Sequence, residues 1–259
     1  ADLSSVQICV VRVAGLPENA PKSAFRGVLH GRASTRECGM LPGMRLFSFR
    51  RSPNALKVRL ALAELREDYE LIEVNLFHGE HLQPQYAKLN PYKRVPVLQA
   101  GKFTLRESNA ILIYLARKHQ KLWPARPEGE ALATQWMMFE AAHIVRQCST
   151  VWWTERVAPA TGMKAASPKK LASVIEELIP ALEVTEAHLT KHQFLMGGHY
   201  TLVDSCFAAT LSLIQGTRVD SGRFGAISAY LSRMRARPSW AAAEGDAILN
   251  FDNVKGQAS

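Results

Sequence analysis

The chain has 259 residues, of which 47% are hydrophobic and 21% are charged, a balance that excludes a largely disordered or fibrous protein. No uncharged apolar run reaches the ~18 residues that a membrane-spanning helix needs, so we expect no membrane partner. The formal net charge of +9, from 32 Lys and Arg against 23 Asp and Glu, favours anionic ligands.

Cysteine usage points to a reducing compartment. The four cysteines stand far apart, with neither C-x-x-C nor zinc-like spacing, at Cys9, Cys38, Cys148 and Cys206. A disulfide scaffold is therefore not expected, and the cytoplasm is the predicted location. We also predict no metal site. His188 and His192 have metal-compatible spacing, but the sequence offers no obvious third ligand.

The first 43 residues differ from the rest. They are rich in glycine and proline and have no sustained helical or strand period. The acidic residues Asp2, Glu18 and Glu37 argue against an arginine-rich transit peptide. We interpret 1–43 as an extension that is disordered or not part of the fold.

Residues 44–118 alternate strands and helices. Ser52 and Pro53 open the first helix, because serine suits the N-cap and proline suits the first helical position. Ser108 opens the second helix, at 109–118. The predicted strands are 44–49, 69–74, 95–98 and 102–105, of which the last two form a hairpin. This order predicts an α/β domain, a mixed sheet with helices packed on it.

The rest of the chain has a helical pattern. Residues 119–127 form a linker that Pro124 and Pro127 stiffen. Predicted helices cover 128–155, 168–191, 201–215 and 226–236, followed by a weakly patterned tail at 241–259. Thr201 and Asp204 form a capping-box variant. We assign 128–259 to one all-helical domain.

Several features of the first domain suit a peptide-like anion. Val95-Pro96 is a candidate cis peptide bond at a strand start, which would turn the Val95 backbone toward an extended ligand. Glu107 could bind an amine, and Ser108 with the helix N-terminus could bind a carboxylate. Simple N-capping is the alternative. His81, Lys93 and Arg94 are possible donors to a second carboxylate.

Ser52 has two possible roles, an N-cap and a hydroxyl donor to a bound anion. A thiol with a pKa near 8.5 is only a few per cent ionised at pH 7, and lowering that pKa by two units needs about 2.7 kcal/mol. A hydroxyl hydrogen bond to a charged acceptor contributes about 1.5–3 kcal/mol, which is the required size. Ser52 could therefore stabilise a thiolate.

Three motifs together resemble one family. The runs SPNALKVRLAL at 52–62, NPYKRVPVL at 90–98 and LRESNAILIYL at 105–115 resemble the soluble glutathione transferases, in particular their theta-like, serine-using branch. Gly79-Glu-His81 and Thr201-Leu-Val-Asp204 match as well. The resemblance covers about 44–240 and implies a thioredoxin-like first domain, with a four-stranded mixed sheet, before an all-α second domain.

The resemblance also implies roles for single residues. Ser52 becomes the donor that stabilises the glutathione thiolate, with Asn54 as a helper or rival. The glutathione-binding residues that it implies are His81, Arg94, Val95, Pro96, Glu107 and Ser108. It places Val95 on the cysteinyl backbone, Glu107 and Ser108 at the γ-glutamyl end, and His81 and Arg94 at the glycine carboxylate. A cytoplasmic, homodimeric enzyme with glutathione as co-substrate is expected.

The expected reaction is attack of the glutathione thiolate on a hydrophobic electrophile, a detoxification chemistry. Candidates for the electrophile pocket are Phe49, Trp136, Phe139 and His143, with Trp152 and Trp153; core packing is their alternative role. A glutathione-dependent lyase, dehalogenase or isomerase on the same scaffold remains an alternative, as does a non-catalytic binding protein. Nucleic acid is not an expected partner, because no basic patch with interleaved aromatic residues is evident.

Overall fold

A computed structural model describes residues 8–11, 43–219 and 222–250 of the chain. They divide into two compact units. The first unit takes the residues up to Leu115 together with Arg237–Ala247, and the second takes Ala116–Ala236 and the residues from Ile248 onward.

The first unit is built on a mixed sheet. Its main strands are β2 (Met44–Ser48), β3 (Tyr69–Glu73), β4 (Val97–Ala100) and β5 (Phe103–Arg106). Strand β2 pairs in parallel with β3 and antiparallel with β4, and β4 forms the predicted hairpin with β5. The predicted four-stranded mixed sheet is confirmed.

A fifth strand extends this sheet beyond the prediction. Strand β1 (Ile8–Val11) pairs antiparallel with β3, which gives the order β1-β3-β2-β4-β5. The interpretation of 1–43 as an extension outside the fold is therefore wrong for these four residues. Pairing to a sheet edge uses main-chain groups, and a four-residue strand therefore leaves little side-chain pattern from which it can be predicted. The rest of 1–43 lies outside the described residues.

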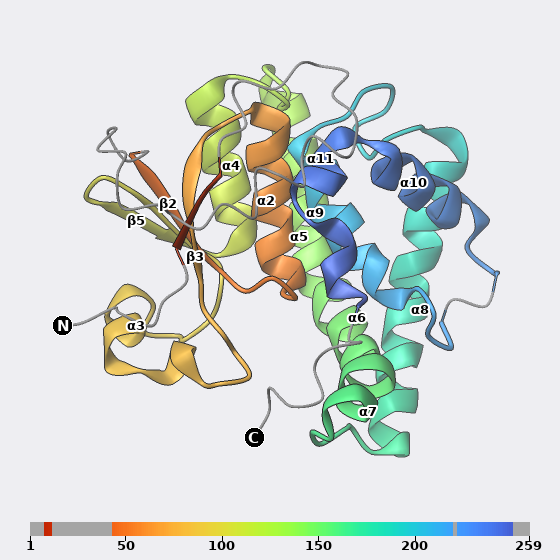
Figure 1. The fold of residues 1–259 in the computed structure, drawn as a ribbon. Helices are drawn as coiled ribbons and strands as arrows, with labels where there is room; N and C mark the ends of the chain where they lie inside the picture. The colour runs from red at the N-terminus through yellow and green to blue at the C-terminus, as the bar shows by residue number, and fades with distance from the viewer. Residues whose placement is uncertain (1–7, 12–42, 220–221, 251–259) are drawn as a thin grey trace. The chain divides into compact units, whose positions relative to one another are not determined.

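Helices lie on the two faces of this sheet. They are α2 (Pro53–Leu65), the 3₁₀ helix η1 (Glu80–Leu82), α3 (Pro84–Leu89) and α4 (Ser108–His119). Successive strand residues point to opposite faces. Phe47 and Phe49 therefore share one face, where they belong to a core cluster with Tyr86 of α3. Helices α2 and α4 lie beside one another next to the sheet (Figure 1).

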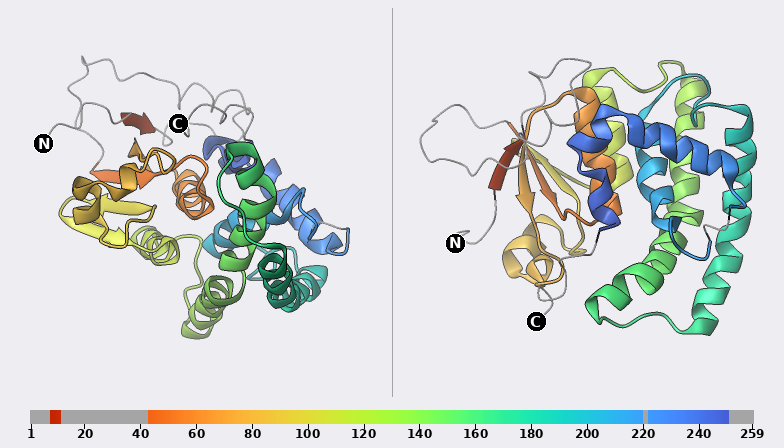
Figure 2. Two further views of the ribbon diagram at one scale, coloured as in Figure 1. Left: turned by 90° about the horizontal axis from the view of Figure 1, so that it is seen from below. Right: turned by 45° about the vertical axis from the view of Figure 1, so that its right-hand side comes forward.

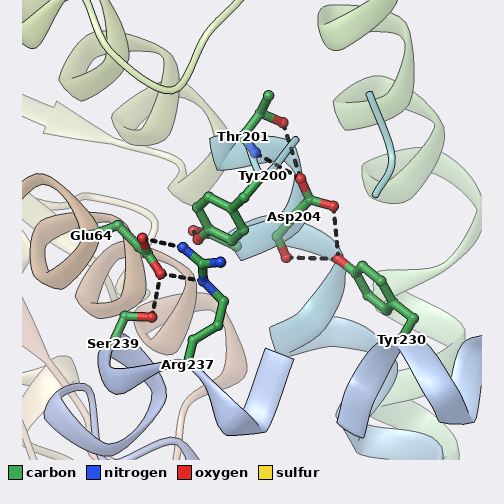
Figure 3. Close-up of polar contacts among 8 residues, drawn as sticks. Glu64, Tyr200, Thr201, Asp204, Tyr230, Arg237 and Ser239 are labelled. Atoms are coloured by element: carbon green, nitrogen blue, oxygen red, sulfur yellow. Dashed lines mark hydrogen bonds and ion pairs between the residues drawn. The ribbon is translucent and has the colours of Figure 1, made fainter. Parts of the chain in front are cut away.

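The segment Arg237–Ala247 is fastened to α2. Arg237 donates to both carboxylate oxygens of Glu64, at 2.6 and 2.7 Å, and the Ser239 hydroxyl donates to the same carboxylate (Figure 3). The segment contains α11 (Pro238–Ala242) and the start of η4 (Gly245–Ile248). The structure differs here from the predicted boundary, which assigned all of 128–259 to the helical domain. A charged pair 173 residues apart has no local pattern that a sequence reveals.

The named elements of the second unit are all helices in the part of the chain that the structure describes (Figure 2), which confirms the predicted all-helical domain. Its α-helices are α5 (Pro127–His143), α6 (Val145–Trp152), α7 (Ala158–Thr161), α8 (Pro168–Lys191), α9 (Leu202–Leu211) and α10 (Gly225–Ala236). The predicted helix 128–155 is interrupted at Ile144, whose φ of −120° and ψ of −54° depart from helical geometry. A π-helix at Trp153–Val157 follows α6, and a 3₁₀ turn at Ser212–Ile214 extends α9.

The start of α9 is organised around Asp204, which is fully buried. Its carboxylate accepts the Thr201 amide at 2.8 Å, as a capping box predicts, and the Leu195 amide at 2.9 Å. The Tyr230 hydroxyl of α10 donates to it at 3.2 Å (Figure 3). Asp204 therefore joins the helix start to a neighbouring helix and to the turn before it.

Candidate functional site

Ser52 lies at the turn between β2 and α2. It is the N-cap of α2, with extended backbone dihedrals, and its Oγ accepts the Ala55 amide at 3.2 Å. Its own amide donates to the Phe49 carbonyl at 2.9 Å. The hydroxyl hydrogen has no acceptor in these bonds, so capping leaves Ser52 able to donate to a further group.

The structure brings the first turns of α2 and α4 together. The Ser108 hydroxyl lies 3.5 Å from Asn54 Oδ1, and Lys57 Nζ donates to Asn109 Oδ1 at 3.4 Å. Both helices therefore present their N-termini, which are the positive ends of the helix dipoles, in one region of the first unit. Such an arrangement attracts an anion.

Glu107 stands between β5 and α4 in a left-handed conformation, with φ of +66°. Its side chain is exposed, and its carbonyl accepts the Ile111 amide at 3.0 Å, which starts α4. A left-handed backbone costs a non-glycine residue of order 1–2 kcal/mol. Local preference therefore does not explain a glutamate at this position.

The loop before β4 is held by side chains that the sequence analysis did not single out. The Val95–Pro96 peptide bond is cis, and both residues are buried. The Arg94 carbonyl accepts the Tyr86 hydroxyl at 2.7 Å and the Asn90 side-chain amide at 2.8 Å. Asn90 opens the Asn-Pro motif, so its buried structural role had a sequence signal, whereas Tyr86 had none.

His81, Lys93 and Arg94 form a basic group in this unit. His81 lies on η1, and its Nδ1 is buried without a hydrogen-bond partner among the described residues. Burial, followed by the charges of Arg94 and Lys93, lowers the pKa of His81. The imidazole is therefore neutral near pH 7, while the exposed Lys93 and Arg94 supply positive charge.

Arg59 of α2 is a further residue near the site that the sequence did not indicate. It is 3% exposed and donates hydrogen bonds to the backbone of Phe49 and Arg50, the residues that precede the Ser52 turn. From the sequence, Arg59 is predicted to be an ordinary charged residue of a helix. Its burial depends on the residues that pack around the helix, so only the folded structure reveals it.

The four main candidates for the electrophile pocket, Phe49, Trp136, Phe139 and His143, lie in different surroundings. Phe49 is buried in the first unit, with its ring against Phe77 at 5.2 Å between centroids. The other three lie on α5 in the second unit. There Trp136 contacts Phe139, and Phe139 contacts His143, at centroid distances of 5.8 and 5.4 Å. Trp136 and Phe139 are half-buried and His143 is exposed. The pocket remains a prediction.

Two other expectations concern absences. Among the residues that the structure describes, no three His, Cys, Asp or Glu side chains lie close enough to hold a metal ion. The rings of His188 and His192 lie 4.5 Å apart, and His188 Nε2 is hydrogen-bonded to the Leu195 carbonyl. Within the same part of the chain, no helix has the length and hydropathy to cross a bilayer.

The fold defines a thioredoxin-like domain, with a mixed sheet and helices, followed by an all-helical domain. The family models for the glutathione S-transferase N-terminal and C-terminal domains match residues 42–117 and 153–238. A glutathione S-transferase of Hyoscyamus muticus is 31% identical over 208 residues, which are 78% of this chain and 97% of that protein. Human glutathione S-transferase theta-1 is 34% identical over 140 residues, covering 52% and 58% of the two chains.

Solved structures agree with these matches. The theta class glutathione S-transferase of Xanthomonas axonopodis pv. citri, solved with glutathione bound, has a TM-score of 0.70 and 25% identity over 77% of this chain and 96% of its own. The chain therefore belongs to the glutathione S-transferase family.

Proposed function

We propose that this protein is a glutathione transferase that uses Ser52 to stabilise the thiolate of bound glutathione. The observation that carries the proposal is the meeting of the first turns of α2 and α4, through Asn54 and Ser108. One turn supplies the Ser52 hydroxyl, and the other supplies Glu107 and Ser108. An extended tripeptide with a thiol and two carboxylates matches this set of groups.

Each part of glutathione has a proposed partner. The γ-glutamyl amine binds the exposed Glu107 carboxylate, and its carboxylate binds Ser108 and the α4 amides. The Val95 backbone, before the cis bond to Pro96, pairs with the cysteinyl residue. Arg94 and the neutral His81 bind the glycine carboxylate. The unpartnered His81 Nδ1 supports this last assignment, because a buried polar atom without a partner is unfavourable.

The proposed reaction forms a carbon–sulfur bond. The Ser52 hydroxyl donates to the glutathione sulfur and lowers the free energy of the thiolate relative to the thiol. The sulfur lone pair attacks an electrophilic carbon, and either a leaving group departs with its bonding electrons or the carbanion formed takes a proton. The protein contributes position and anion stabilisation, without a covalent intermediate on the enzyme. Asn54, which lies beside Ser108, is proposed to help Ser52 stabilise the thiolate.

Exposed apolar side chains support the homodimer that the family resemblance implies. Tyr92 and Phe103 of the first unit are 74% and 47% exposed, and Leu132 and Met138 of α5 are 51% and 55% exposed. Surfaces that bind a partner often carry large exposed apolar side chains, so the residues of each unit are candidates for an interface. Sedimentation velocity of the purified protein tests this, since a monomer at micromolar concentration contradicts it.

Replacement of Glu107 tests the glutathione site. Glu107→Ala removes the proposed partner of the glutathione amine, so we expect the calorimetric Kd for glutathione to rise by about 30-fold. Glu128→Ala, an exposed glutamate in the first turn of α5, is the matched control and leaves the Kd unchanged. Wild-type protein that binds no glutathione at millimolar concentration contradicts the proposed function. Binding that survives in Glu107→Ala contradicts only the role of Glu107.

A further inference from the structure

We propose that Arg59 is a positioning residue that fixes the backbone before Ser52 and thereby aims the Ser52 hydroxyl; the inference rests on the proposed function. The guanidinium of Arg59 is buried and bonds to four oxygen atoms. Nε donates to the Ala243 carbonyl at 3.0 Å and Nη1 to Ser48 Oγ at 2.9 Å. Nη1 also lies 3.3 Å from the Phe49 carbonyl, and Nη2 donates to the Arg50 carbonyl at 2.9 Å.

These bonds connect directly to Ser52. The Phe49 carbonyl that faces Arg59 also accepts the Ser52 amide at 2.9 Å. One carbonyl oxygen therefore lies between the guanidinium and the backbone of the catalytic candidate. If this carbonyl moves, the Ser52 amide and the direction of its side chain move with it.

The main chain of Arg50 is held by two side chains. The Arg50 carbonyl accepts from Arg59, and the Arg50 amide donates to the Glu73 carboxylate at 2.8 Å. The Arg50 side chain forms an ion pair with Glu244 at 3.0 Å. Both main-chain polar groups of Arg50 are therefore held by side chains rather than by regular secondary structure. A turn held in this way has little freedom to rotate.

Arg59 also forms a hydrogen bond to the segment that follows α10. Ala243 belongs to Arg237–Ala247, which the Arg237–Glu64 pair fastens to α2. The guanidinium thus lies between this segment and the Ser52 turn, within the first unit. Arginine suits this place because its planar, permanently charged group presents five donors in fixed directions, which lysine cannot do. A buried cation is costly, and an apolar side chain would fill the same space without that cost.

The test uses the full chain and three variants. Arg59→Lys keeps the positive charge but cannot reach the four oxygens. Ser48→Ala removes one acceptor of Arg59 and leaves its other bonds intact. Arg66→Lys, an exposed arginine at the C-terminal end of the same helix, is the matched control. Each protein is measured for the pKa of the bound glutathione thiol, from thiolate ultraviolet absorbance against pH, and for kcat, KM, the calorimetric Kd and the melting temperature.

A positioning role predicts a specific combination of results. In Arg59→Lys the pKa of the bound thiol rises by about one unit and kcat falls about three- to tenfold, while the Kd for glutathione stays within about threefold. Ser48→Ala shows smaller changes in the same direction, and Arg66→Lys shows none. The changes in Arg59→Lys are measured on folded protein, as judged by its cooperative melting.

Other results overturn the inference. A lower melting temperature with an unchanged thiol pKa and unchanged kcat shows that Arg59 only stabilises the fold. If Arg59→Lys does not fold, Ser48→Ala decides: an unshifted thiol pKa in that variant contradicts the proposal. These outcomes are distinct from failure of the proposed function, in which the wild-type protein itself binds no glutathione or gives no thiolate signal.

Discussion

Ser52→Ala is expected to lower the kcat of glutathione conjugation to an aryl halide by about 100- to 1000-fold, with little change in the Kd for glutathione. Removal of one preformed donor to a developing or bound anion has an effect of this size. The loss falls on kcat because the proposed partner of the Ser52 hydroxyl is the sulfur, whereas Glu107, Ser108 and Arg94 are the proposed partners of the two ends of the peptide. The measurement is steady-state kinetics beside calorimetry on the same samples.

The control must separate catalysis from helix capping, because Ser52 Oγ also accepts the Ala55 amide. The chain offers a matched case in Ser167, which precedes Pro168, caps α8 and accepts the Lys170 amide at 3.3 Å. Each serine-to-alanine change removes a cap, at a cost of about 1 kcal/mol of stability. Only Ser52→Ala is expected to lose turnover. Equal kcat values for Ser52→Ala and the wild type contradict the catalytic role.

Asp204→Ala is expected to reduce the free energy of unfolding by about 3–5 kcal/mol. The carboxylate is fully buried and accepts from the amides of Thr201 and Leu195 and from the Tyr230 hydroxyl. Its removal leaves buried donors unpaired, and each such donor costs about 1–3 kcal/mol. Chemical denaturation measures the change. Glu176→Ala, an exposed acid of α8, is the control and is expected to change stability by less than about 0.5 kcal/mol.

The pH dependence of this effect has a definite sign. Burial raises the pKa of Asp204 from 3.8 to about 6, although the hydrogen bonds from Leu195, Thr201 and Tyr230 act in the opposite direction. The folded state therefore holds this proton more tightly than the unfolded state. The stability contributed by the protonated form is complete below about pH 4 and is lost as pH rises toward about 6, a change of about 3 kcal/mol.

Asp204→Asn isolates that contribution, because it keeps one acceptor oxygen and cannot ionise in this range. Between about pH 4 and pH 7, the stability of Asp204→Asn relative to the wild type is expected to improve by about 3 kcal/mol. Denaturation curves of both proteins at each pH cancel the effects of all other titrating groups. A difference that stays constant across this range shows that the pKa of Asp204 is not raised.

Much of the architecture could be predicted from local patterns. Ser52-Pro53 and Ser167-Pro168 mark helix starts because a serine cap and an N1 proline act within one turn, and both helices begin there. The hairpin of β4 and β5 turns at Gly101, whose φ is +60°. Thr201 and Asp204 likewise bond within three residues. Each of these signals is short-range, so a single sequence displays it.

Periodicity, capping and motif spacing are local properties of the chain, so the amino-acid sequence predicts the two-part architecture, the four main strands and the family. Contacts between residues far apart in the chain became known from the folded structure. It placed Asn54 beside Ser108 and added Ile8–Val11 to the edge of the sheet. It also joined Arg237 to Glu64 and buried Arg59 against the turn before Ser52. These contacts depend on burial and on main-chain groups far apart in the chain, which no local pattern encodes.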